Sequence, residues 1–151
     1  MQKSISLASA IVVLLASSSA QAQEPANPIG FTLSCTMPAG VQTCNAQVSV
    51  PAGKRLVIEA VSARAVTPSG QTIQLYISTS AATIPSGSTA SRHFIALTPA
   101  PNGTTYYATH PIRMYAMTGG TVSIHTQRIT APAGSPGTVS HEVWFSGYLL
   151  P

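Results

Sequence analysis

Apolar and polar residues alternate along most of the chain, with the two-residue period of β-strands that bury one face. The longest such stretch is residues 50–79, in which Thr67-Pro68-Ser69-Gly70 separates two alternating segments. Pro and Gly favour a tight turn there, so the pattern predicts a hairpin of two long strands. Residues 55–58 are apolar on both faces, so this end of the first strand should be covered on both sides. The core-facing pairs of the hairpin would be Ile73 with Ala65, Leu75 with Ala63 and Ile77 with Val61.

A second hairpin is predicted from residues 112–117 and 121–129, joined by Thr118-Gly119-Gly120. If Met117 opposes Thr121, the apolar side chains of both strands fall on one inner face. Guanidinium, phenol, imidazole and amide groups on the outer face could together grip a carboxylate, a sugar or a peptide. A solvated sheet face is the plainer interpretation of the same residues. The outer face would display Arg113, Tyr115, Ser123, His125 and Gln127.

Further strands are predicted at residues 44–50, 92–97, 104–110 and 138–150, and loops are predicted at residues 80–90 and 131–137. No segment keeps a helical period over three turns. Short strands with turns every 8–12 residues predict an all-β fold. We expect a single antiparallel β-sandwich of the jelly-roll kind, with about seven to nine strands.

The start of the chain has the pattern of a secretory signal peptide. Lys3 precedes an apolar centre at residues 11–16, and Ala20-Gln21-Ala22 is a small-x-small cleavage site. The apolar run is far shorter than the ~20 residues of a membrane-spanning helix. We therefore expect cleavage after Ala22, export to the periplasm or the cell exterior, and no transmembrane segment. The predicted organisation is a signal peptide at residues 1–22, a flexible leader at 23–30 and a β-sandwich domain at 31–151.

The chain contains two cysteines, Cys35 and Cys44. In an exported protein the default state of such a pair is a disulfide. A two-residue turn at Ala39-Gly40 would place the cysteines directly opposite each other, so the bridge is expected to staple a small hairpin. Their spacing is too long for the CxxC-type pairs that bind metals or carry out redox chemistry.

Charged residues make up only 7 % of the chain, against about a quarter in typical globular proteins. Removal of the signal would leave six basic and three acidic residues, scattered along the sequence. Because nucleic-acid binding needs a basic stripe or patch, no nucleic-acid partner is predicted. A surface of Ser, Thr, Gln and Asn is poorly protected against self-association, which favours a homo-oligomer.

The last predicted strand contains two adjacent aromatic residues, Trp144 and Phe145, whose side chains point to opposite faces. One is expected in the core and the other on the surface, where exposed rings commonly serve as platforms for sugars. The surface ring would lie near a tyrosine: Tyr106, Tyr107 or Tyr148. The predicted ligand-binding set is Arg113, Tyr115, His125, Gln127 and Trp144.

Catalytic and metal chemistry have little support in the sequence. There is no Asp, and only Glu59 and Glu142 could supply acids, although Glu59 is expected to be partly buried. No GxSxG nucleophile motif is present. No enzyme activity, cofactor or metal site is predicted. Strands could bring together some of four histidines that lack the close spacings of metal sites: His93, His110, His125 and His141.

The sequence alone does not reveal a biochemical activity. The expected role is non-catalytic, as a ligand- or glycan-binding module whose partner is a small molecule, a glycan or a protein. The alternative is a structural subunit that self-assembles through sheet edges or faces, and a metal-binding protein or enzyme ranks third. A monomer with an exposed aromatic patch favours the first role, and an oligomer that buries the patch favours the second.

Overall fold

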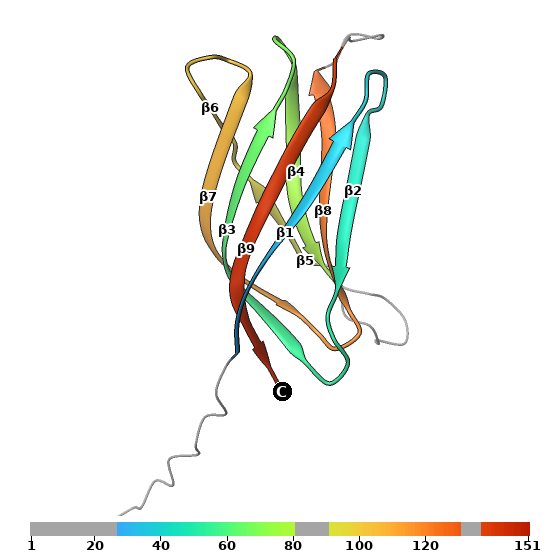
Figure 1. The fold of residues 1–151 in the computed structure, drawn as a ribbon, viewed down its shortest axis with the longest axis vertical. Coiled ribbons are helices and arrows are strands. Elements are labelled where there is room, and N and C mark those ends of the chain that lie inside the picture. The colour runs from blue at the N-terminus through green and yellow to red at the C-terminus, as the bar shows by residue number, and fades with distance from the viewer. Residues whose placement is uncertain (1–26, 81–90, 131–136) are drawn as a thin grey trace, which may run out of the picture.

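A computed structural model describes residues 27–80, 91–130 and 137–151. These residues form nine β-strands (Figure 1), and they contain no helix that could cross a membrane. The strands are β1 (Asn27–Met37), β2 (Thr43–Ser49), β3 (Arg55–Val66), β4 (Thr72–Thr79), β5 (Ser91–Ile95), β6 (Thr98–Pro99), β7 (Thr105–Ala116), β8 (Thr121–Thr130) and β9 (Val139–Leu150).

The strands pack as two antiparallel sheets, one against the other (Figure 1). Sheet A has the order β1-β9-β3-β7-β6, and sheet B has the order β2-β8-β4-β5. The chain changes sheets between β1 and β2, between β2 and β3, and between β3 and β4, so sequence neighbours are seldom neighbours in a sheet. This is the strand order of a jelly roll, and the predicted fold class is confirmed.

The core lies between the sheets and is formed by the alternating apolar positions of both. Val61 and Ala63 of β3 and Phe145 of β9 face it from sheet A, and Leu75 and Ile77 of β4 face it from sheet B. All five side chains are at most 3 % exposed. Because burial of a large apolar side chain contributes about 1.5–3 kcal/mol, these positions hold the two sheets together.

The first predicted hairpin is wrong, although its faces are right. β4 and the part of β3 from Val61 onward bury the sides expected from their alternation, but β3 lies in sheet A and β4 in sheet B. The tight turn itself forms, with the Gln71 N–H bonded to the Pro68 carbonyl (3.2 Å), while the Thr67 N–H bonds to the Thr104 carbonyl of another loop (2.8 Å). Such a turn can lead to the other sheet or back along the same sheet, and both routes give the same alternation.

The second predicted hairpin is wrong for the same reason. β7 belongs to sheet A and β8 to sheet B, although the turn between them forms with the Gly120 N–H bonded to the Met117 carbonyl (2.8 Å). Met114 and Ile124 are both buried as expected, but they come from opposite sheets. The outer positions of β7 and β8 therefore lie on opposite sides of the sandwich.

β3 has a register irregularity between Ile58 and Ala60, against both β7 and β9. Glu59 has no partner in either register, and its side chain is exposed, not partly buried as expected. The irregularity reverses the alternation, so Val57 points to the outer face of sheet A while Val61 points to the core. Val57 is nevertheless fully buried, which confirms that this end of β3 is covered on both faces.

The disulfide between Cys35 and Cys44 is present, but it does not staple a hairpin. Cys35 lies on β1 in sheet A and Cys44 on β2 in sheet B, so the bridge joins the two sheets. Their neighbours in register are His141 on β9 and Thr126 on β8, which share a hydrogen bond of 2.9 Å between His141 Nε2 and the Thr126 hydroxyl. A covalent link and a polar link thus cross the core side by side.

Replacement of both cysteines by alanine is expected to lower the free energy of unfolding by roughly 2–3 kcal/mol, because the bridge restricts the unfolded chain. The fold should persist, since the apolar core is unchanged. Urea unfolding of the double variant and the oxidised wild type, followed by far-UV circular dichroism, measures the difference. Equal unfolding midpoints would show that the bridge between the sheets adds nothing to stability.

A buried arginine closes the upper end of the sandwich. Arg128, on the inner face of β8, is 4 % exposed. It donates to the side-chain oxygen of Gln71 and to the carbonyls of Met37 (3.0 Å), Pro38 (3.1 Å) and Gly137 (3.1 Å). These acceptors belong to three separate connections between strands. All four are uncharged, so amide and carbonyl dipoles stabilise the buried guanidinium.

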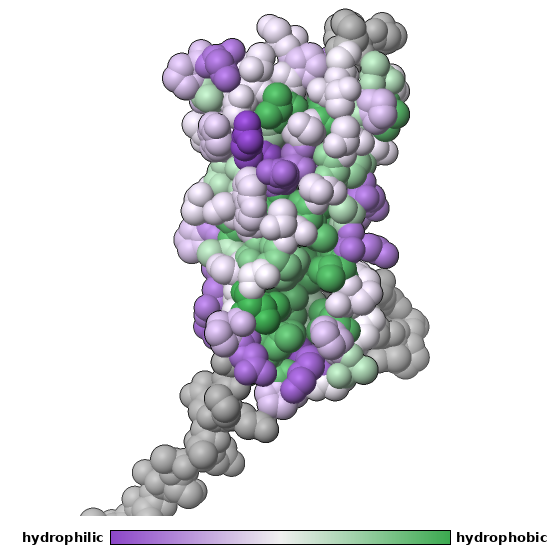
Figure 2. Space-filling model, viewed as in Figure 1, coloured by the Kyte–Doolittle hydropathy of each residue, from purple (hydrophilic) through white to green (hydrophobic). Residues whose placement is uncertain are grey.

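The side of the sandwich between β1 and β2 is partly open. Below the disulfide these two strands diverge (Figure 1), and apolar side chains are visible in the lower half of this side (Figure 2). Ile29 and Phe31 of β1 are partly exposed there, and Val48 of β2 is 36 % exposed. We call this strip, formed by Ile29, Phe31 and Val48, the apolar seam.

Two segment boundaries differ from those predicted. β1 begins at Asn27, so residues 27–30 belong to the sandwich and not to a flexible leader; Pro28 is tolerated because β1 is an edge strand. β7 continues through Pro111, which lies at the register irregularity with β3. The segments outside the described residues include the predicted signal peptide, the leader at 23–26 and most of the loops predicted at 80–90 and 131–137.

Candidate ligand-binding site

The structure divides the predicted ligand-binding residues between the two outer surfaces of the sandwich. Arg113 and Tyr115 of β7 and Trp144 of β9 lie on the outer face of sheet A. His125 and Gln127 of β8 lie on the outer face of sheet B. The prediction that one face carries Arg113, Tyr115, His125 and Gln127 is therefore wrong, and one small ligand cannot contact both groups.

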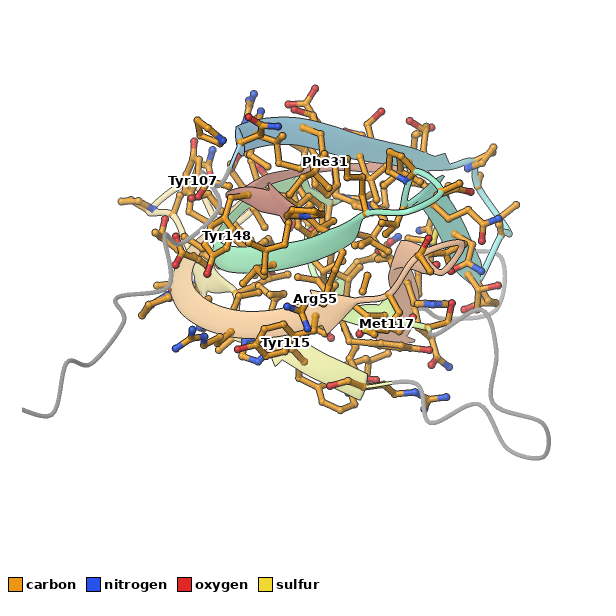
Figure 3. All side chains as sticks on the ribbon, turned by 90° about the horizontal axis from the view of Figure 1, so that it is seen from below. Phe31, Arg55, Tyr107, Tyr115, Met117 and Tyr148 are labelled. Atoms are coloured by element: carbon orange, nitrogen blue, oxygen red, sulfur yellow. A yellow bond between two sulfur atoms is a disulfide. The ribbon has the colours of Figure 1, made fainter. Side chains whose placement is uncertain are left out.

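The outer face of sheet A has a groove of about 490 Å³ at the lower end of the sandwich. Three strands form it, because Val57 of β3 lies between Tyr115 of β7 and Tyr148 of β9 in the register. Val57 is the buried floor, with Tyr115 and Tyr148 as its neighbours on the strands at either side. Figure 3 labels the side chains of both tyrosines. This sheet A groove is lined by Arg55, Val57, Arg113, Tyr115, Met117, Tyr148 and Leu150.

The irregularity at Glu59 explains why the groove exists. A strictly alternating β3 would point Val57 into the core together with Val61, and the outer face would then have no apolar floor here. With the alternation reversed, Val57 and Arg55 both face outward, beside the side chains of β7 and β9. The bulge therefore converts this end of β3 from a core strand into part of a surface site.

Arg113 is the charged group of the sheet A groove, and its partners are phenols rather than carboxylates. Its guanidinium carbon lies 6.0 Å from the centre of the Tyr115 ring. Electrostatic attraction to Tyr115 and a hydrogen bond to its phenol oxygen raise the pKa of Arg113, and Tyr148 adds to this effect. The groove thus combines positive charge, aromatic surface and hydroxyl groups, and its positive charge is available to an anion.

Trp144 extends the site along the same face. It is 40 % exposed and lies four residues before Tyr148 on β9, which is roughly 13 Å along the strand. The row between them includes Gly30, Ser146 and Ala60, which are neighbours across β1, β9 and β3, and the exposed Glu59 precedes Ala60 on β3. A ligand that lies along the sheet from the groove to the indole ring therefore passes these small side chains and the exposed Glu59.

Five residues of the sheet A groove are missing from the set predicted from the sequence: Arg55, Val57, Met117, Tyr148 and Leu150. The apolar run at residues 55–58 indicated a covered outer face, but it did not indicate what covers it. Tyr148 was recognised only as a possible neighbour of Trp144. The pairing of β3 with both β7 and β9 brings these residues together, and that pairing joins strands far apart in the sequence.

The outer face of sheet B has a smaller hollow, of about 280 Å³, beside His125. His125 and Tyr76 are stacked with ring centres 4.7 Å apart, and the Ser78 hydroxyl lies 2.9 Å from His125 Nε2. Burial, followed by the charge of Arg92, lowers the pKa of His125, so the imidazole is neutral near pH 7. His125, Arg92 and Phe94 all contact the Tyr76 ring, which leaves little of it for a ligand.

The four histidines do not converge on one point. His93 of β5 and His110 of β7 meet from opposite sheets, with ring centres 5.8 Å apart. Burial, with a smaller contribution from His110, lowers the pKa of His93. His141 is in the core, and His125 is on the outer face of sheet B. Within residues 27–80, 91–130 and 137–151, no three His, Cys, Asp or Glu side chains are arranged to hold a metal ion.

Comparison with known proteins identifies no family. No protein-family model matches the sequence, and no curated protein matches it. A solved structure from desmodium yellow mottle tymovirus aligns with 99 % of this chain and 98 % of its own chain, at a TM-score of 0.29 and 11 % identity. A likeness this weak carries no inference about function, so the surface chemistry of the chain itself is the basis for one.

Proposed function

We propose that this protein is an exported, non-catalytic binding module whose ligand is an acidic glycan, held on the outer face of sheet A. The observation that carries the proposal is the sheet A groove, in which Arg55 and Arg113 accompany two tyrosine rings over an apolar floor. Aromatic rings pack against the C–H face of a sugar, and a guanidinium binds a carboxylate or sulfate through paired hydrogen bonds. Acidic polysaccharides occur in the compartments to which a signal peptide leads.

The placement of the acidic residues supports binding without hydrolysis. Glu142 lies opposite Arg64 in the register of β9 with β3, and Arg64 is five residues along β3 from Glu59. That separation is roughly 16 Å along the strand. The two carboxyls of a glycosidase are about 5–10 Å apart, so these two acids cannot act together on one glycosidic bond.

The proposal is tested by titrating the protein with polygalacturonate, an acidic polymer, and with a neutral glucan as the comparison. We expect binding to polygalacturonate that weakens with added salt, because ions screen the attraction between guanidinium and carboxylate groups. Arg113→Ala is expected to weaken binding at least about tenfold, since a hydrogen bond to a charged group contributes about 1.5–3 kcal/mol. Isothermal titration calorimetry measures both effects.

Arg92→Ala is the matched control, because it removes an exposed guanidinium from the outer face of sheet B. Its affinity should equal that of the wild type. Trp144→Ala should weaken binding of the polymer more than binding of a single galacturonate, because Trp144 lies beyond the groove. Failure to bind polygalacturonate, alginate or a sulfated glycan would overturn the proposal, and so would a loss caused by Arg92→Ala but not by Arg113→Ala.

A further inference from the structure

The two sheets have four strands with a free edge among the described residues: β1 and β6 in sheet A, and β2 and β5 in sheet B. β6 has two residues, one of them Pro99, β5 has five residues and carries Arg92, and β2 has seven residues. The part of β7 beyond β6 carries Pro111 and Arg113. β1 differs from all of these in length, because it has eleven residues, each of them paired with β9.

β1 lacks the features with which proteins usually protect an exposed edge, such as charged residues, bulges and interior prolines. It has no charged residue, and its one proline, Pro28, is next to its start. After Gly30 its outer side chains are all hydroxyls: Thr32, Ser34 and Thr36, each of them exposed. Ser and Thr side chains that oppose each other across antiparallel strands hydrogen-bond favourably. Such an edge is complementary to a second copy of itself.

The surroundings of β1 also favour a partner at this edge. Ile29 and Phe31 of the apolar seam lie on the inner side of β1 and are partly exposed. Apolar surface is visible in the lower half of this side of the molecule (Figure 2). The disulfide fixes β1 to β2, so the edge is ordered before any partner arrives, and less entropy is lost on binding. A charged partner would find no charge to pair with along this strand. A second neutral edge of the same length would match it.

We propose that two copies of this chain pair through their β1 strands, antiparallel and about a two-fold axis, so that sheet A continues from one copy into the other. The axis is perpendicular to the sheet, because antiparallel strands related in this way show the same face to the same side. The two sheet A grooves then open on one side of the dimer. The pairing does not depend on the proposed glycan binding, but it would let one polymer be held at two points.

The mass of the protein in solution, measured by size-exclusion chromatography with light scattering over a concentration series, tests the pairing. We expect a dimer for the wild type and at least tenfold weaker association for the double variant T32K/S34K. In the central registers of a two-fold pair, lysines at these positions face lysines of the other copy, and like charges directly opposite each other are unfavourable. T32E/S34E should be monomeric for the same reason. An equimolar mixture of the two variants should dimerise again, which misfolded variants could not do.

S140K/S146K is the matched control, because it adds the same charge to exposed positions on β9, one strand in from the edge. It should remain a dimer. A wild type that is monomeric at the highest concentration reached would overturn the proposal. A dimer that persists in both T32K/S34K and T32E/S34E would mean that the interface lies elsewhere. Loss of the dimer in S140K/S146K would mean that added net charge, and not its position on β1, prevents association. Either result would also overturn the proposal.

Discussion

Replacement of Arg128 by methionine is expected to lower the free energy of unfolding by about 2–5 kcal/mol. Methionine fills similar space but donates no hydrogen bond, so the carbonyls of Met37 and Gly137 lose this donor, while the Pro38 carbonyl keeps its hydrogen bond from the Val41 N–H. Each buried acceptor left unpaired costs about 1–3 kcal/mol. Part of this cost is offset, because a guanidinium whose Nε has no partner no longer has to be buried.

The controls for Arg128 separate its hydrogen bonds from its charge. Arg64→Met removes an exposed arginine from the outer face of sheet A and should change the free energy of unfolding by less than about 0.5 kcal/mol. Arg128→Lys should lower the free energy of unfolding by less than Arg128→Met and by more than Arg64→Met. The reason is that an ammonium keeps the charge but cannot span all four acceptors. Urea unfolding gives these differences. Stability of Arg128→Met within about 1 kcal/mol of the wild type would mean that the arginine does not hold the three connections together.

Arg128 also marks a limit of prediction from the sequence. The alternation of residues 121–129 puts it on the inner side together with Val122 and Ile124. A charged residue near a strand end nevertheless looks solvent-exposed unless its acceptors are known. One of these acceptors, Met37, is 91 residues away along the chain. No local pattern encodes a contact over that distance.

The faces of the strands could be predicted, whereas their partners could not. A period of two decides which side a residue presents, and this is why Trp144 is exposed and Phe145 is in the core, as expected. The partner of a strand depends on the route that the chain takes after each turn. The turn at residues 67–71 fits both a hairpin and a change of sheet, so the sandwich was predictable and the hairpin register was not.

The same distinction, between the face of a strand and its partners, explains why only part of the predicted site lies together. Arg113 and Tyr115 stay together because residues two apart on one strand share a face in any topology. His125 was joined to them only through an assumed pairing of β7 with β8, and it lies on the other sheet. Val57 and Tyr148 are placed in the groove by the strand order β9-β3-β7 and by the bulge in β3. Neither feature can be predicted from a local sequence pattern.

Acidification from about pH 7.5 to about pH 4 is expected to lower the free energy of unfolding by about 3 kcal/mol through His141 alone. His141 is 2 % exposed, and burial lowers its pKa from 6.5 to about 4. One ring nitrogen pairs with Thr126, and the other, Nδ1, has no partner, so a second N–H would have nothing to donate to. The folded protein therefore keeps the imidazole neutral over a pH range in which the unfolded chain protonates it.

The sign of the effect follows from the protons bound in each state. Between pH 6.5 and pH 4 the unfolded state binds more protons than the folded state, so stability falls as the pH falls, by up to about 1.4 kcal/mol per pH unit. The contribution is complete above pH 6.5 and is lost as the pH falls through the folded-state pKa. His93 and His125, whose pKa values are also lowered, add slopes of the same sign.

Comparison with His141→Gln isolates this residue, because glutamine does not titrate and can still hydrogen-bond to Thr126. Urea unfolding at a series of pH values and constant ionic strength should give the variant a profile flatter by about 3 kcal/mol, whatever its stability at neutral pH. His125→Gln, at a half-exposed site, should remove a smaller part of the slope. Parallel profiles for the wild type and His141→Gln would mean that His141 titrates normally, and that the polar link beside the disulfide does not exclude a proton.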